Sequence, residues 1–100
     1  MQHAYDTHPD GFCIRITGRM THADHKAFRE ILGRINDATE TRVIFDLAQV
    51  EFLDSSALGM LLIVRDAVVQ QKRTVVLRGA SGQVEKLMKI AKLHKYFEVE

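Results

Sequence analysis

The chain has 100 residues, of which 46% are hydrophobic and 27% are charged, a composition typical of a folded domain of ordinary size. Its formal net charge of +1 gives no electrostatic basis for nucleic acid or an anionic membrane as a partner. The longest apolar run, Ala57 to Val64, is far short of the ~20 residues that span a bilayer, the first ten residues are too polar for a secretory signal, and a single cysteine, Cys13, cannot form an internal disulfide. We therefore expect one cytoplasmic domain over residues 1–100, without direct membrane insertion.

The first third of the sequence predicts a β-hairpin followed by an amphipathic helix. Residues 3–7 can form a short strand, and a turn of Pro, Asp and Gly leads into alternating apolar positions at 12, 14 and 16, the period of a strand that ends at Gly18. Thr21 and Asp24 have the spacing of a capping box at the start of a helix. That helix keeps its apolar side chains on one face as far as Ile35.

The centre of the chain, residues 42–69, predicts a buried strand followed by a long helix. Val43 to Phe45 form a short β-branched and aromatic run that breaks at Asp46, and we expect a loop from there to the helix. Asp54 to Ser56 carry short side-chain oxygens, which can accept the unpaired N–H groups of a first helical turn. The apolar segment from Ala57 to Val69 is too long for a strand. The sequence therefore places two adjacent serines at the start of a helix.

The motif DSSALG at residues 54–59, after a strand that ends in FDL, closely resembles the signature of the STAS family. The resemblance is to the bacterial anti-sigma factor antagonists and their single-domain relatives, in which a hydrophobic strand, a short loop and an apolar-Asp-Ser-(Ser or Thr)-Gly-Leu motif precede a helix. It implies that Ser55 is the residue that a partner kinase phosphorylates. Ala57 stands where the commonest pattern has glycine, and alanine favours a helix over glycine by roughly 1 kcal/mol.

The last third of the sequence predicts a strand, a third helix and a final strand. Residues 74–77 form a short apolar run that Gly79 ends, Ser81 can cap a helix with an apolar face, and residues 96–99 can form the last strand. The order of elements predicts an α/β fold, with a mixed β-sheet of four to five strands and three main helices on right-handed crossovers. This agrees with the STAS fold, so the resemblance covers nearly the whole chain.

Ser55 could act either as a catalytic nucleophile or as the substrate of another enzyme. A nucleophilic serine needs a base, and neither Ser-x-x-Lys, nor Gly-x-Ser-x-Gly, nor a histidine close in sequence surrounds Ser55, although a distant histidine could approach in the fold. An acceptor serine needs only exposure and a fixed position, because the kinase supplies ATP, metal and base. We therefore expect no catalytic residue, no enzymatic activity and no cofactor, and a phosphorylation site at Ser55. The alternative is that Ser55 and Ser56 only cap the helix.

The expected partner-binding residues are those around this serine, namely Asp54, Ser56, Ala57, Met60 and Val64. Met60 and Val64 are one helical turn apart, so they can form a docking patch beside the phosphorylation site. The alternative is that this helix, which is apolar almost all round, is buried at most of its positions.

Three further groups of residues have weaker patterns. His22 and His25 could share a metal ion, but no third ligand completes a site and we expect no metal. Cys13 is interpreted as a packing residue. The row of Lys86, Lys89 and Lys92 is most simply a solvated helix face, with docking of an acidic partner as the alternative.

The family resemblance implies a phospho-regulated protein-binding switch. The unphosphorylated form would bind a serine kinase/anti-sigma factor of the histidine-kinase-like ATPase type. Phosphorylation of Ser55 would weaken that complex, and a metal-dependent serine phosphatase would restore the binding form. The output would be sigma-factor release or, as in some single-domain relatives, control of biofilm or motility. The alternative is a constitutive STAS subunit of a membrane transport ATPase, whose association would not depend on Ser55.

Overall fold

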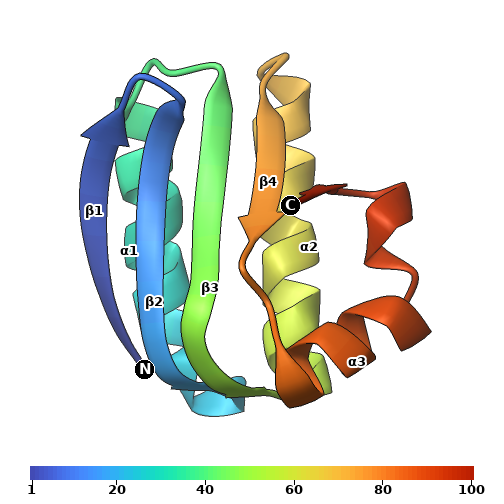
Figure 1. Ribbon diagram of the computed structural model, residues 1–100. Helices are drawn as coiled ribbons and strands as arrows, with labels where there is room; N and C mark the ends of the chain where they lie inside the picture. The colour runs from blue at the N-terminus through green and yellow to red at the C-terminus, as the bar shows by residue number, and fades with distance from the viewer.

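A five-stranded mixed sheet forms the centre of the computed structural model, which describes residues 1–100 (Figure 1). The strands lie in the order of the chain, with β1 antiparallel to β2 and the remaining neighbours parallel. The α/β fold with a mixed sheet and three main helices is therefore as predicted. The elements are β1 (Gln2–His8), β2 (Gly11–Met20), η1 (His22–Asp24), α1 (His25–Asp37), β3 (Arg42–Leu53), α2 (Ser55–Gln70), β4 (Thr74–Arg78), α3 (Gly82–Ile90), η2 (Leu93–Lys95) and β5 (Glu98–Val99), where η denotes a single 3₁₀ turn.

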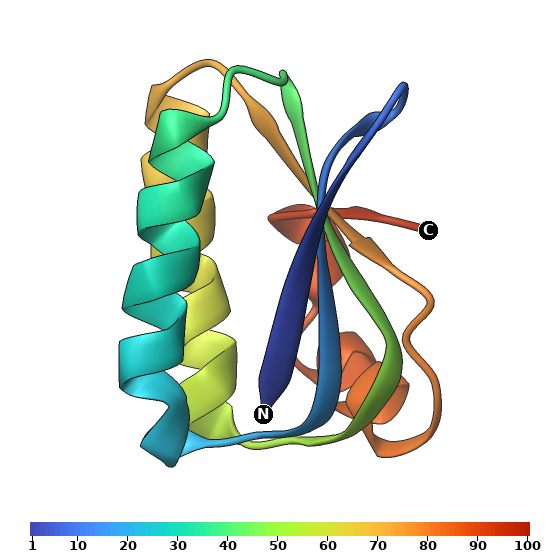
Figure 2. The same cartoon turned by 90° about the vertical axis from the view of Figure 1, so that its left-hand side faces the viewer.

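The two longest helices, α1 and α2, lie side by side on one face of the sheet (Figure 2). Each connects two neighbouring parallel strands, and both connections advance in the same direction across the sheet. Right-handed crossovers of this kind place both helices on the same face. The main core lies between these layers, where side chains such as Ile14, Ile31, Phe45 and Leu61 are fully or almost fully buried. No helix has the length and hydrophobicity that crossing a lipid bilayer requires.

A second, smaller apolar cluster lies on the opposite face of the sheet. It consists of Cys13, Ile44 and Val76, one residue each from β2, β3 and β4, and all three are buried. Burial is the main cause that raises the pKa of the Cys13 thiol, and the Asp46 carboxylate raises it further. A thiol with a raised pKa forms little thiolate, so this cysteine is a packing residue, as predicted.

Ion pairs on the same face hold the C-terminal strand to the sheet. The Arg42 guanidinium contacts Glu98 at 2.6 Å and Glu100 at 2.7 Å, and Arg78 contacts Glu100 at 2.8 Å. The hydrogen bonds from Arg78 and then Arg42 lower the pKa of the Glu100 carboxyl. Backbone pairing of β5 is limited to two residues, and these ion pairs add to it together with the backbone hydrogen bonds of Glu100 to Leu77 and Gly79.

The predicted break of the central strand at Asp46 is wrong, because β3 continues to Leu53. Its second half pairs with β2, and two register shifts in this pairing indicate β-bulges. The shifts also explain why the buried side chains Leu47, Val50 and Leu53 are three residues apart instead of two. The expected loop before the helix is thus reduced to Asp54 alone, and α2 begins at Ser55.

The predicted ends of two other strands differ from the structure. β2 continues past Gly18 to Met20, because it pairs with the extended β3. The expected last strand over residues 96–99 is only Glu98–Val99, because residues 93–95 form the η2 turn and Phe97 packs into the core.

Candidate functional site

The candidate site lies at the end of the sheet where β2 and β3 finish, opposite each other at Met20 and Leu53 (Figure 1). β4 ends earlier, opposite Asp46, and residues 79–81 continue from it to the start of α3, so η1, α2 and α3 all begin near this end of the sheet. Ser55 is the first residue of α2. The topology therefore brings segments that are about thirty residues apart in sequence to the same place, an arrangement that often forms binding sites in α/β proteins.

Asp54 caps α2 and also ties it to the segment that follows β2. Its Oδ1 accepts a hydrogen bond from the backbone N–H of Ala57 at 2.8 Å, and its Oδ2 accepts one from the backbone N–H of His22 at 3.1 Å. Its own N–H donates to the carbonyl of Met20 at 3.1 Å. The bond from Ala57 is the main cause that lowers the pKa of the Asp54 carboxyl, with the bond from His22 contributing. Asp54 is therefore a fixed negative charge at neutral pH.

Ser55 and Ser56 are both exposed and occupy the first two positions of α2. The N-cap is Asp54, so neither serine caps the helix, and neither hydroxyl is used for capping. The first N–H groups of a helix have no partner within the helix, and the helix dipole is positive at this end. Ser55 is thus an exposed hydroxyl on a fixed backbone, at a position that favours added negative charge.

Gln83, in the first turn of α3, fixes the backbone just before the site. Its Oε1 accepts a hydrogen bond from the N–H of Leu53 at 3.0 Å, and its Nε2 donates to the Leu53 carbonyl at 2.9 Å. On β2, which pairs with β3, the Arg19 guanidinium lies 4.3 Å from the centre of the Phe52 ring. Sequence reasoning did not identify Gln83 or Arg19, because both contacts join residues that are far apart in the chain and depend on the length of β3.

The fold brings the side chain of His22 close to Asp54, the neighbour of Ser55. Its Nδ1 lies 3.7 Å from Oδ2 of Asp54, too far for a hydrogen bond, and its side chain is 79% exposed. Asp54 already uses both carboxylate oxygens to accept backbone N–H groups, and no hydrogen bond joins the Ser55 hydroxyl to His22. The side chains therefore do not form a Ser-His-Asp arrangement, which needs the histidine bonded to both neighbours. The residues also form no cluster of three or more His, Cys, Asp or Glu side chains that could hold a metal ion.

The other predicted partner-binding residues have much less exposed surface than the serines. Ala57 is fully buried, Met60 is 6% exposed and Val64 is 2% exposed, so α2 packs most of its apolar surface into the core. Ala57 can influence a partner only through the position of the helix start. Met60 and Val64 line a groove between α1 and α2, together with the side chain of Ile63.

Ile63 is the exposed apolar side chain of this groove, and the sequence prediction did not single it out. It is 64% exposed, whereas its neighbours on α2 are mostly buried. From α1 the groove is lined by Phe28, Arg29 and Leu32, with His25 at the end nearer the start of α1. The volume of the groove is about 110 Å³. An apolar surface that a partner could cover thus lies near the middle of α2, about two turns after Ser55.

Comparison with known proteins identifies relatives over almost the whole chain. A family model of the STAS domain matches residues 3–100. The STAS-domain containing protein PA14_20770 of Pseudomonas aeruginosa (strain UCBPP-PA14) is 35% identical over 86 residues, which are 86% of this chain and 84% of that protein.

Solved structures share the same arrangement of strands and helices. The anti-sigma factor antagonist SpoIIAA in its unphosphorylated form has a TM-score of 0.81 and 20% identity, over 99% of this chain and 88% of that chain. An anti-sigma factor antagonist from Mycobacterium paratuberculosis has a TM-score of 0.80 and 17% identity, over 98% and 83% of the two chains. The Bacillus cell fate determinant SpoIIAA in the phosphorylated form has a TM-score of 0.72 and 18% identity, over 99% and 91%. At these levels of identity the likeness establishes the fold.

Proposed function

Because this chain belongs to the STAS domain family, we propose that it is a phospho-regulated protein-binding switch of the anti-sigma factor antagonist kind. In this proposal Ser55 is the phosphoacceptor. The unphosphorylated chain binds a serine kinase/anti-sigma factor of the histidine-kinase-like ATPase type in the cytoplasm, and a metal-dependent serine phosphatase restores the binding form. The existence of SpoIIAA structures in unphosphorylated and phosphorylated forms supports the proposal, because that protein shares the fold.

The observation that carries the proposal is that Asp54, and not Ser55, caps the start of α2. Asp54 performs the capping of α2, which leaves the adjacent hydroxyl of Ser55 exposed and free to react. The bonds to Ala57, His22 and Met20 hold the backbone on either side in place. A kinase substrate needs this combination of access and fixed position, and it needs no base of its own.

A phosphate on Ser55 should leave the domain folded and act mainly on the binding surface. It adds about −1.5 to −2 charges at pH 7, and the start of a helix stabilises a negative group by about 0.3–1 kcal/mol. The ionised Asp54 next to it opposes this gain. A unit charge about 5 Å from a carboxylate of the partner, at an effective dielectric constant of about 20–80, costs roughly 1–3 kcal/mol. The complex would thus weaken about five- to hundredfold.

The proposed binding surface starts at Asp54, Ser55 and Ser56 and continues along α2. Met60 and Val64 contribute through the walls of the groove, and Ile63 contributes the exposed apolar contact. Because Ser55 stands at one end of this surface, a partner that covers α2 from its start to Val64 would lie directly against the added charge.

The experiment is a pull-down from native lysate with the wild type, Ser55→Ala and Ser55→Asp as baits, and with Ser56→Asp as the matched control. We expect the wild type and Ser55→Ala to capture an ATPase-type kinase, and we expect Ser55→Asp to capture at least fivefold less of it. Mass spectrometry of the recovered chain should place phosphate on Ser55. An equal loss with Ser56→Asp would mean that any added charge at the helix start disrupts binding, without a specific acceptor.

Capture of the same partner by all four baits, with Ser55 never modified, would refute the switch. If that partner is a transporter subunit, the constitutive role in a membrane transport ATPase becomes the better explanation. If the switch holds, the identity of the captured partner separates sigma-factor release from control of biofilm or motility.

A further inference from the structure

The segment from the start of α3 to Phe97 carries a concentration of positive charge that the proposed switch does not use. Residues 82–97 contain Lys86, Lys89, Lys92 and Lys95 but only one acidic residue, a net charge of +3, whereas the rest of the chain is net −2. All four lysines are exposed. The ion pairs of the molecule are made by other groups, so none of these lysines has an acidic partner within 4.0 Å. We call these four residues the lysine patch.

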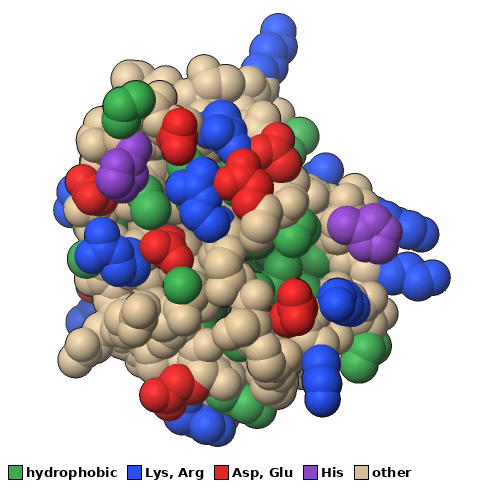
Figure 3. Space-filling model, viewed as in Figure 1, with side chains coloured by type: hydrophobic (Ala, Val, Ile, Leu, Met, Phe, Trp, Pro, Cys, Tyr) green, Lys and Arg blue, Asp and Glu red, His purple; other side chains and the backbone are tan.

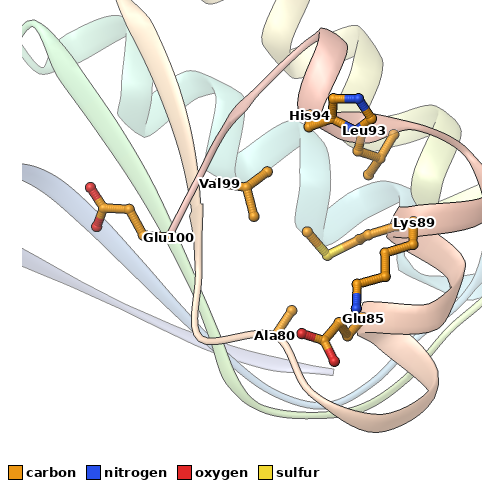
Figure 4. Close-up of a pocket in the computed structure, with 8 residues that line it drawn as sticks. Ala80, Glu85, Lys89, Leu93, His94, Val99 and Glu100 are labelled. Carbon is orange, nitrogen blue, oxygen red and sulfur yellow. The ribbon is translucent and has the colours of Figure 1, made fainter.

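An apolar hollow of about 110 Å³ opens beside the lysine patch, between α3, η2 and β5 (Figure 3). Figure 4 shows the side chains of Leu93 and Val99 directed toward its centre. Met88 and Leu93 are almost fully buried at its floor, and Val99 is 47% exposed at its wall. Lys89 and His94 stand at its rim. Apolar atoms, the ammonium group of Lys89 and the imidazole of His94 thus meet at one concave place on the surface.

The carboxylates near the hollow do not neutralise the lysine patch. Glu100 lines the hollow through its backbone end, but Figure 4 shows its carboxylate pointing away, and it pairs there with Arg42 at 2.7 Å and Arg78 at 2.8 Å. Glu85 is the other acidic residue of the lining, and its unpaired carboxylate offsets one of the four lysines. With Glu85 counted, the net charge of residues 82–97 is still +3.

A hollow of this size has room for water. Its apolar floor offers such waters few hydrogen bonds, so an apolar side chain that displaces them gains affinity. The exposed Ile90 (78%) extends the apolar surface among the lysines. A membrane is too flat to fill a concave site, and the phosphates of a nucleic acid do not use an apolar floor. A protein segment with one apolar side chain and flanking carboxylates fits both the apolar floor of the hollow and the positive charge of the lysine patch.

We propose that the hollow and the lysine patch form a second docking surface, which binds an acidic protein segment. One apolar side chain of the segment occupies the hollow against Leu93 and Val99, and its carboxylates face the lysine patch and His94. The surface lies toward the end of α3, whereas the start of α3 contacts the Ser55 site through Gln83. Binding here therefore does not require Ser55 to be unphosphorylated.

The test is fluorescence anisotropy with a fluorescein-labelled peptide that has one leucine flanked on each side by three glutamates. We expect saturable binding to the full chain that weakens when salt is raised from about 50 to 500 mM. Lys89→Glu should weaken binding roughly three- to tenfold, and Lys86→Glu serves as a second variant. Lys26→Glu, an exposed lysine on α1, is the matched control and should bind as the wild type does.

Three further binding measurements, one with a changed peptide and two with changed protein, decide the outcome. The same peptide with serine in place of leucine should bind at least threefold more weakly, and Val99→Glu should weaken the leucine peptide more than the serine peptide. Ser55→Asp should bind the peptide as the wild type does, which separates this surface from the proposed switch. Equal binding of the leucine and serine peptides, an equal effect of Lys26→Glu, or no saturable binding up to about 1 mM overturns the proposal. Binding to phosphatidylserine vesicles without binding to the peptide also overturns it.

Discussion

Replacement of Gln83 by alanine tests whether α3 holds the backbone on which Ser55 is presented. The side chain makes two hydrogen bonds to the backbone of Leu53, at 3.0 and 2.9 Å, and Leu53 is fully buried. Each hydrogen bond contributes about 0.5–1.5 kcal/mol net, so the loss of both costs about 1–3 kcal/mol. Water can reach the freed groups in part, which favours the lower half of this range. For a chain of 100 residues, 1 kcal/mol corresponds to a change of roughly 4–8 °C in Tm.

The assay is thermal and urea unfolding of the wild type, Gln83→Ala and Gln83→Glu, with Ser81→Ala as the control. Ser81 caps the same helix without a side-chain bond, so its replacement should change Tm little. Glutamate keeps the acceptor but cannot donate to the Leu53 carbonyl at pH 7, so Gln83→Glu should lose at least as much stability as Gln83→Ala. Near pH 4 part of the glutamate is protonated and can donate again, which should narrow the gap to wild type. A Tm for Gln83→Ala within 1 °C of wild type would refute the reasoning.

Three other outcomes follow from particular side chains. Ile63→Asp should weaken capture of the switch partner at least fivefold in the pull-down with an unchanged Tm, whereas Val69→Asp, at the other end of the same helix and 42% exposed, should not. Lys92 has a positive φ of 55° just after α3, so Lys92→Gly should raise the free energy of unfolding by up to about 1 kcal/mol in urea. The pKa of Glu100 is lowered, chiefly by Arg78, so its contribution to stability is complete above pH 4.5 and is lost as pH falls through the lowered pKa. The Glu100 N–H bonds to a β4 carbonyl, and its protection factor against amide exchange should therefore fall in acid, a dependence that Glu100→Gln should remove.

The sequence predicted the order of the elements because each carries a local signal. The hairpin turn, the capping box of Thr21 and Asp24 and the apolar periods all depend on residues that are near one another in the chain, and the structure contains the corresponding elements. The length of β3 was mispredicted because it is set by pairing with β2. Asp46 and Ala48 are unfavourable in an isolated strand, and the register shifts that accommodate this segment depend on the neighbouring strand.

For the site, the sequence identified the helix start but not what holds it in place. The capping chemistry of Asp54 is local, and the structure contains its bond to Ala57. The bonds that Asp54 receives from His22 and that Leu53 exchanges with Gln83 join residues about thirty positions apart, and no local pattern marks them. The apolar character of α2 was visible in the sequence, but the separation of the exposed Ile63 from its buried neighbours depends on how α1 packs against it.

The two proposed surfaces share one element, α3, and its length determines how strongly they can influence each other. Gln83 in its first turn contacts the Ser55 site, and Met88 in its last turn lines the hollow. Five residues of helix separate Gln83 from Met88, a rise of about 7.5 Å, which is close to the Debye length of about 8 Å at physiological ionic strength. Salt therefore weakens the field of a phosphate on Ser55 at the hollow but does not abolish it. The two sites should then influence each other only weakly at physiological ionic strength, so the chain could stay attached to an acidic partner at one end of α3 while its association at the other end is switched.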